Sequence, residues 1–301
     1  AWSTKGSGSM QNVKYLAAVS GGPDSMALLD IYRKHIKMVC HVNYHHRPTA
    51  NRDAKIVKQY CKQYKIPCSI LNVTVSIYKK YRKLSHNFQT MARLIRYDLF
   101  KLVSKKTKIT TILIAHNQDD FLETALMQKR KGSDSLFYGI DHRSTFDSLN
   151  VYRPLLNKRK ACLQAYCDKH NLTYGIDETN NDLKYERNRI RSEINQWNNT
   201  KYQSVLKSIN QYNKKHALLR KQIEKQYNDW SKVNYSVKLF NQYKNKPHVL
   251  YKFLIDHDIP NINGNKINQA IDFINHGNGK LRVTNTLAIV KVNKQVKVVS
   301  L

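Results

Sequence analysis

A short Gly-Gly segment between two apolar stretches restricts the fold of this chain more than any other feature. The run Tyr15-Leu16-Ala17-Ala18-Val19 precedes it, and Met26-Ala27-Leu28-Leu29 follows it. This order predicts a β-strand, a glycine turn and a helix. The turn itself reads Ser20-Gly21-Gly22-Pro23-Asp24-Ser25.

The turn combines several requirements of a phosphate site. Glycines let backbone N–H groups approach an anion closely, and a helix N-terminus adds unpaired N–H groups and a positive dipole end. Pro23 fits the first helical turn, where a missing N–H costs nothing, and Ser20 and Ser25 add hydroxyl donors. Asp24 cannot bind phosphate directly, which predicts a Mg²⁺ ion between its carboxylate and the phosphates. An ordinary proline-started turn is the alternative interpretation.

Strand-like and helix-like segments alternate over roughly the first 115 residues. Apolar runs occupy 13–19, 38–44, 68–75 and 111–115, and amphipathic stretches occupy 24–35, 50–65 and 88–104. This alternation predicts βαβ units and a parallel sheet. Ligands of such sheets bind beyond the carboxyl ends of the strands, so we expect residues 20–25 and those after Ala115 to share one crevice.

The pattern changes after about residue 198. Before that point we expect a strand at 151–152, a helix at 158–170 and a second helix from near Asn188. After it we expect helical structure at 200–230, two helices within 247–275 and two strands around Asn293-Lys294. The sequence therefore predicts a domain at 10–197 and a smaller, mainly helical α+β domain at 198–301. Residues 1–9 resemble a vector-derived leader.

The formal net charge is +31, from 52 Lys+Arg and 21 Asp+Glu. Such a charge favours a polyanionic partner, above all nucleic acid, although A+T-rich coding alone also enriches lysine. Residues 78–86 interleave four basic residues with two tyrosines, which suits phosphate contact and base stacking. A solvated loop or helix face is the alternative for this segment.

Membrane and redox signals are weak. No apolar stretch approaches the 18 residues of a transmembrane helix, so we expect a cytoplasmic protein without a membrane partner. The cysteines include no Cys-x-x-Cys pair, so neither a disulfide framework nor a zinc or iron–sulfur site is indicated. They are Cys40, Cys61, Cys68, Cys162 and Cys167.

Two clusters of charged residues carry candidate chemistry. Asp119, Asp120 and Glu123 follow the run 111–115, and a helix from near Gln118 would put Glu123 on one face with each aspartate. They suit a cationic substrate group or a metal, and favourable dipole interaction at a helix start is the alternative. Arg93 and Arg96 share a face of the expected helix 88–104 and suit phosphate or developing negative charge, unless they form a plain surface pair.

Six segments occur in the order seen in the tRNA(Ile)-lysidine synthetases, a family of the PP-loop, or N-type, ATP pyrophosphatases. The turn resembles the pyrophosphate loop of that superfamily and lacks the lysine of a Walker loop. The most particular segment is Asp177-x-Thr179-Asn180 with Tyr185-x-Arg187-Asn188-x-x-Arg191. The other segments are His41-Val42-Asn43-Tyr44-His45-His46-Arg47, Ala92-Arg93-x-x-Arg96-Tyr97, Ala115-His116 through Asp120 with Glu123-Thr124, and Arg153-Pro154-Leu155-Leu156.

The resemblance implies an α/β, adenine nucleotide alpha hydrolase-like fold and an ATP-dependent ligase. In that family ATP adenylates O2 of the wobble cytidine of an isoleucine tRNA with a CAU anticodon. The ε-amine of free L-lysine then displaces AMP at C2, which gives lysidine and switches decoding to AUA. Diphosphate and AMP are the by-products, and no covalent enzyme intermediate is required.

The resemblance also implies roles for individual residues. Asp24, which would bind Mg²⁺, and Arg93, which would stabilise phosphate charge, are expected to be catalytic, as are Asp120 and Glu123, which would bind lysine. Residues that would bind ATP are Ser20, Gly21, Gly22, Pro23, Asp24, Ser25, Ala115 and His116. Residues that would contact tRNA are Lys79, Lys80, Arg82, Lys131, Arg187 and Arg191.

Two departures and two alternatives stay open. Asn117 and Phe121 stand where the family commonly has histidine and glutamine, so neither receives a catalytic role. The region after 198 is short, which leaves open how the acceptor stem is recognised. Whether the chain forms a homodimer is also open. A PP-loop tRNA thiolase is one alternative, although it generally needs catalytic or cluster-binding cysteines. A non-catalytic basic RNA-binding protein is the other.

Overall fold

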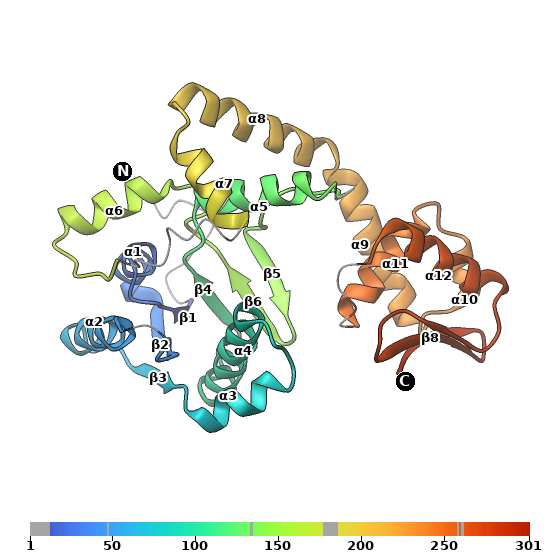
Figure 1. The fold of residues 1–301 in the computed structure, drawn as a ribbon, viewed down its shortest axis with the longest axis horizontal. Helices are drawn as coiled ribbons and strands as arrows, with labels where there is room; N and C mark the ends of the chain where they lie inside the picture. Colours follow the sequence, from blue (N-terminus) through green and yellow to red (C-terminus); the bar gives the residue numbers. More distant parts are fainter. Residues whose placement is uncertain (1–12, 47, 133–134, 177–185, 258, 260–261) are drawn as a thin grey trace. The chain divides into compact units, whose positions relative to one another are not determined.

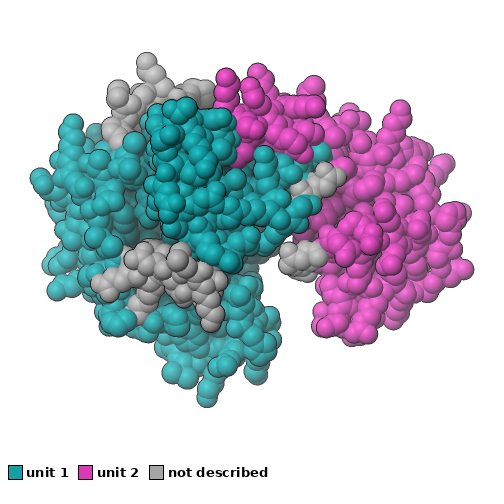
Figure 2. Space-filling view, turned by 45° about the horizontal axis from the view of Figure 1, so that its top comes forward, with its two compact units in different colours: residues 1–206 teal, residues 207–301 magenta. Residues whose placement is uncertain are grey.

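The chain forms two compact units (Figure 2). The computed structural model describes residues 13–46, 48–132, 135–176, 186–257, 259 and 262–301. The first unit comprises residues 1–206 and the second residues 207–301. The division, at 206/207, falls within helix α8 (Asn199–Lys215), nine residues beyond the expected boundary at 197/198. In the described ranges, no helix is both long and apolar enough to cross a membrane.

A six-stranded sheet forms the centre of the first unit, and its strand order is β3-β2-β1-β4-β6-β5. All neighbouring pairs are parallel except β5 with β6, which confirms the predicted parallel sheet. The strands are β1 (Tyr15–Ala18), β2 (Ile36–Asn43), β3 (Cys68–Asn72), β4 (Thr111–Ile114), β5 (Arg143–Phe146) and β6 (Leu149–Tyr152). The edge strand β5, Arg-Ser-Thr-Phe, was not anticipated because it has no apolar alternation.

Helices cover both faces of the sheet (Figure 1). One core joins alternate strand residues such as Ala17 and Leu113 to α1 (Pro23–Ile31), α2 (Ala50–Gln63) and α6 (Lys160–Lys169). The neighbouring residues Leu16 and Ile112 point the other way and pack against α4 (Phe88–Thr107). Because both faces are buried, each strand needs apolar residues at successive positions, and this need explains the continuous runs in the sequence.

The remaining helical elements of the first unit lie at its edges. They are η2 (Arg33–His35, a 3₁₀ turn), α3 (Val75–Arg82), α5 (Gln118–Arg130) and α7 (Glu186–Asn195). Helix α3 corrects part of the base-stacking expectation for residues 78–86. Tyr81 is buried in a small core with Val73, Met91 and Ile95, so its ring is not available to a nucleobase.

The second unit is mainly helical with a small antiparallel sheet, as predicted. Its elements are α9 (Ala217–Lys232), α10 (Val237–Asn241), α11 (Lys246–Asp256), α12 (Gly264–His276), β7 (Lys280–Arg282), β8 (Leu287–Val292) and β9 (Gln295–Ser300). The stretch expected at 200–230 is interrupted near His216, where α8 gives way to α9. Asn293 and Lys294 both have positive φ, as a tight hairpin between β8 and β9 requires.

The strand order reverses between β1 and β4. From β1 the chain builds β2 and β3 on one side, then returns to place β4 on the other. Ala18 pairs with Ile114, so the segments after these two residues leave the same edge side by side. This is the topological switch point at which open α/β sheets bind ligands, and the two segments lie side by side there as expected.

Replacing Gly21 with alanine is expected to destabilise the first unit. Gly21 has φ +92°, and an added Cβ would lie 3.0 Å from both the Cβ and the carbonyl oxygen of Asp53. We expect G21A to lose about 2 kcal/mol or more of unfolding free energy, measured by chemical denaturation. G264A, at an open helix start, is the control and should change little. Equal stability of G21A and the parent chain would contradict this reading.

Candidate active site

The loop after β1 presents a cluster of backbone donors. The N–H groups of Ser20 and Gly21 each donate to Ser25 Oγ over 3.1 Å, and Ser25 Oγ donates to the Gly22 carbonyl. No side chain caps the N-terminus of α1, which begins with Pro23. These donors are satisfied within the loop by Ser25 Oγ, so the feature that suits an anion is the N-terminus of α1, which has no side-chain cap and carries the positive end of the helix dipole.

Two close backbone approaches fix the shape of this loop. Gly175 N donates to the Gly21 carbonyl over 2.8 Å, and the buried Asp53 lies against both glycines. A Cβ on Gly175 would lie 2.1 Å from Asp53 Oδ1. Arg52 pairs with Asp53 and also donates to the Ile176 carbonyl. The start of α2 and the segment around Gly175 thus contact the backbone of the loop and fix its position.

Asp24 is the least compensated carboxylate in the crevice. Its Oδ1 is buried and has no hydrogen-bond partner. Burial, followed by repulsion from Asp120, raises the pKa of Asp24 to about 6, while Lys160 and the Asn117 amide oppose the rise and Asp119 adds to it. A buried, unpaired carboxylate oxygen beside other carboxylates is a place where a cation would be stabilised.

A capping box fixes the start of α5. The Asn117 side chain accepts from Asp120 N, and Asp120 Oδ2 accepts from Asn117 N. Asn117 therefore has a structural role at the position where the family commonly has histidine. Asp119 turns outward to α6, where its Oδ2 accepts from Lys160 N over 2.6 Å and its Oδ1 lies 3.9 Å from Arg159 Nε.

Asp120 and Glu123 do share one face of α5, and they meet two arginines of α7. Arg187 spans both carboxylates, with Nε 2.7 Å from Glu123 Oε2 and Nη2 3.0 Å from Asp120 Oδ1. Arg191 Nε lies 2.7 Å from Glu123 Oε1. Glu123 is only 2% exposed, and these two arginines are the partners of its buried carboxylate.

Arginines also gather around His116, which follows β4. Arg153 Nε donates to His116 Nδ1 over 3.0 Å. Burial, followed by repulsion from Arg153, Arg187, Arg96 and Arg93, lowers the pKa of His116 to about 3. His116 is therefore neutral at physiological pH, within electrostatic reach of the arginine pair on α4. Arg93 and Arg96 are exposed, and the Arg93 guanidinium lies over the Tyr97 ring.

The residues expected to contact tRNA fall into two groups. Lys79, Lys80 and Arg82 are exposed on α3, and Lys131 is exposed just after α5. Arg187 and Arg191 are instead held in the ion pairs with Glu123. Of the particular motif at 177–191, residues 177–185 lie outside the described residues.

Three residues that the sequence reasoning did not assign support the site. Asn117 caps α5, Asp53 supports the glycine loop and Arg153 holds His116. The Asn-x-x-Asp spacing at 117–120 is a capping-box signal that could have been recognised. Asp53 and Arg153 gave no such signal, because their partners are distant in sequence.

The donor set fits Mg²⁺ bound together with a nucleotide. No group of three or more His, Cys, Asp or Glu side chains able to hold a metal occurs in the described part of the chain. Mg²⁺ commonly takes one or two protein carboxylates and completes its shell with phosphates and water. Asp24, with its unpartnered Oδ1 beside the anion loop, supplies that kind of ligand.

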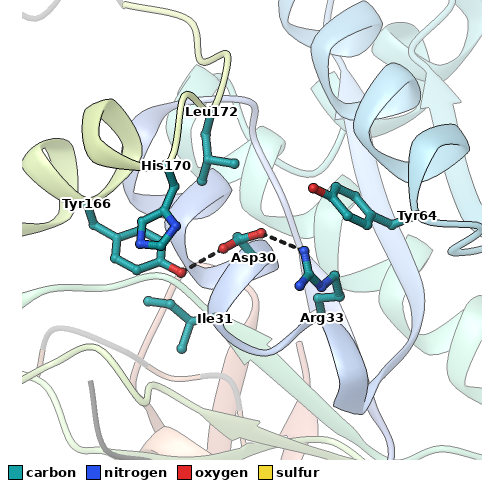
Figure 3. Close-up of a pocket in the computed structure, with 7 residues that line it drawn as sticks. All are labelled: Asp30, Ile31, Arg33, Tyr64, Tyr166, His170 and Leu172. Atoms are coloured by element: carbon teal, nitrogen blue, oxygen red, sulfur yellow. Dashed lines mark hydrogen bonds and ion pairs between the residues drawn. The ribbon is translucent and has the colours of Figure 1, made fainter. Parts of the chain in front are cut away.

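A cavity of about 320 Å³ lies at the far end of α1 (Figure 3). Its centre is Asp30, which accepts from Tyr166 and Tyr60 over 2.6 Å each and pairs with Arg33 over 3.2 Å. Helix α1 starts at the glycine loop and ends beside this cavity, so the two features occupy opposite ends of the helix. The contacts of Asp30 connect α1 to α2 and α6, and they involve none of the candidate site residues.

Comparison with known proteins agrees with this geometry. Residues 4–197 match the PP-loop domain family. The chain is 45% identical to a tRNA(Ile)-lysidine synthase of Ureaplasma parvum, over 88% of this chain and 80% of that protein. It is 41% identical to one of Malacoplasma penetrans, over 89% of this chain and 92% of that protein.

A solved structure supports the fold alone. The U34-tRNA thiolase NcsA from Methanococcus maripaludis, determined with its 4Fe–4S cluster, superposes with a TM-score of 0.54 at 16% identity. The match covers 69% of this chain and 72% of that one. The glycine loop, the crevice and the extent of sequence identity lead to one assignment: the chain belongs to the tRNA(Ile)-lysidine synthase family of PP-loop enzymes.

Proposed function

We propose that this chain ligates L-lysine to C2 of the wobble cytidine in an isoleucine tRNA with a CAU anticodon. The observation that carries the proposal is the single crevice at β1 and β4. It combines the glycine loop, the buried carboxylate of Asp24 and the arginines that surround His116. Membership of the lysidine synthase family names the chemistry that these groups would serve.

The first step would transfer AMP to the base. The cytidine O2 attacks the α-phosphorus of ATP, the bond to the β-phosphate oxygen breaks, and diphosphate leaves. Residues Ser20–Ser25 would hold the phosphates at the N-terminus of α1, which has no side-chain cap, with Ala115 and His116 at the adjacent strand end. Arg93 would stabilise charge on the transferred phosphate. Asp24 would hold Mg²⁺, which neutralises phosphate charge when bound.

The second step would replace AMP with lysine. The lysine ε-ammonium group first loses a proton to become a free amine. The amine nitrogen then attacks C2, the C2–O2 bond breaks, and AMP leaves with that oxygen. Asp120 and Glu123 would orient the cationic amine before attack. In the resting structure these carboxylates are paired with Arg187 and Arg191, so lysine must share or displace those contacts. Correct positioning of this kind can lower the barrier by about 7–11 kcal/mol.

The tRNA would approach through exposed basic residues. Lys79, Lys80 and Arg82 on α3, together with Lys131, offer side chains that phosphates can neutralise. Residues 10–197 would then form the catalytic domain, and residues 198–301 would add further tRNA contacts. Free L-lysine and ATP are the small substrates in this proposal.

A thiolase function has less support from the cysteines. Burial raises the pKa of Cys40 and of Cys167 to about 12, which disfavours thiolate formation at either position. Cys167 donates from its thiol to the Pro23 carbonyl and sits in the packed interface between α1 and α6. Cys162, on the same helix, is exposed, so these two cysteines do not face one site.

Lysine incorporation tests the proposal directly. We expect ATP-dependent transfer of labelled lysine to a CAU-anticodon isoleucine tRNA transcript and none to a transcript with wobble uridine. E123Q should slow the transfer at least tenfold while AMP-linked tRNA still forms, because its defect lies in the lysine step. E193Q is the matched control, since Glu193 pairs with Arg130 away from the crevice.

Three outcomes separate the candidate functions. Thiolation of the transcript in place of lysine transfer would favour the thiolase. Binding of tRNA without release of AMP would favour the non-catalytic binding protein. Equal lysine transfer by E123Q and E193Q would contradict the role given to Glu123.

Asp24 should lower the stability of the folded chain in the absence of Mg²⁺. Its pKa is raised from 3.8 to about 6, so the folded state loses stability as pH rises from about 4 to 6, and the loss is complete above pH 6. D24N removes this cost. We expect it to stabilise the chain at pH 7.5 by about 1–3 kcal/mol, to lose the advantage at pH 4 and to abolish lysine transfer.

The same substitution at Asp119 should act in the opposite direction. Asp119 accepts from Lys160 N and lies near Arg159, so D119N should lower the unfolding temperature at pH 7.5. Thermal unfolding in a chelating buffer at both pH values measures each difference. A D24N variant no more stable than the parent at pH 7.5 would refute the electrostatic account of Asp24.

A further inference from the structure

Arg153 is a buried cation whose hydrogen bonds, in the described part of the chain, go to neutral acceptors. Only 7% of the residue is exposed, and its guanidinium donates to His116 Nδ1, the Asp141 carbonyl and Ser144 Oγ. Burying a guanidinium is costly, and buried arginines normally pair with carboxylates. Here every acceptor is neutral.

The bond from Arg153 determines how His116 is protonated. A guanidinium is always a donor, so His116 Nδ1 must accept and carry no proton. The ring is neutral, so its single proton lies on Nε2. Besides Arg153, the charged groups that influence His116 come from two elements, α4 with Arg93 and Arg96 and α7 with Arg187, and all are cations.

We propose that Arg153 is a positioning residue that fixes His116 as a neutral Nε2–H donor for the phosphate charge of the bound nucleotide. The inference rests on the proposed function for the identity of the reaction, but the protonation state can be observed without it. Arg153 belongs to the Arg-Pro-Leu-Leu segment that follows β6, next to β4 in the sheet. The sheet therefore brings Arg153 beside His116 across a long sequence separation.

The positive charge around His116 and Arg153 explains why a neutral histidine suits this place. Burial, and to a smaller extent repulsion from Arg93, lowers the pKa of Arg153, while Tyr97 and Asp141 act against the shift. The arginines that act on His116 leave this place with excess positive charge. An incoming phosphate group would offset that excess. A histidine held neutral adds a hydrogen bond at the same place without a further charge to desolvate.

The test is ¹⁵N NMR of the histidine rings in the full chain, with His116 assigned by comparison with H116Q. The parent chain should show His116 as the Nε2–H tautomer from pH 6 to 8. R153Q should give mixed tautomers, while R143Q should leave the spectrum unchanged. Arg143 is the matched control because it lies on the neighbouring strand β5, with its guanidinium over the Tyr152 ring.

Kinetics supply the second measurement. R153Q and H116Q should each slow tRNA-dependent release of diphosphate at least tenfold, and the double variant should be no slower than the slower single variant. Independent, multiplicative losses would overturn the proposal. So would an Nδ1–H tautomer or an imidazolium in the parent chain at pH 6.5, which requires no variant to fold. Absence of lysine transfer with the expected tautomer would contradict the proposed function instead.

Discussion

The crevice depends on negative charge that the fold concentrates at the ends of two adjacent strands. Parallel pairing of β1 with β4 brings Asp24 close to Asp119 and Asp120. Asp119 is neutralised by the start of α6, and Asp120 by its capping contacts and Arg187. Asp24 has no comparable partner, and its raised pKa expresses that imbalance. A cation delivered with the nucleotide would restore the balance.

The rest of the crevice carries the complementary charge. Arg93, Arg96, Arg153 and Arg187 all act on a neutral histidine, His116, which follows β4. The carboxylates of α5 pair with Arg187 and Arg191 of α7. One region thus suits phosphate and the other an amine. A ligase that activates a base with ATP and then attacks it with an amine needs both kinds of site.

Local signals in the sequence were sufficient to predict most of the fold. The Gly-Gly turn, the continuous apolar runs and the spacing of Asp120 and Glu123 each act within a few residues. They correctly predicted the parallel sheet, the adjacency of the segments after β1 and β4, and the common face of the two carboxylates. Strand β5 was not predicted, because an edge strand needs little apolar alternation.

Tertiary contacts account for what could not be predicted. Burial of Tyr81 depends on packing between α3 and α4, which the basic pattern at 78–86 does not reveal. The pairing of Glu123 with Arg187 and Arg191 joins residues more than sixty positions apart. The Arg153–His116 bond likewise follows from strand order. Each of these contacts decides which side chains are available to a ligand, so the site could be located from sequence but its resting state could not.

The central claim is that Asp24 makes nucleotide binding depend on a cation and on its own ionisation. Calorimetric titration of Mg²⁺ with a non-hydrolysable ATP analogue from pH 5 to 8, repeated with D24N and D119N, tests it most directly. The account predicts that affinity falls about tenfold per pH unit below pH 6 in the parent chain and in D119N, with proton release near pH 6. D24N should bind weakly at every pH. Affinity independent of pH in the parent chain, or unchanged in D24N, would contradict the account.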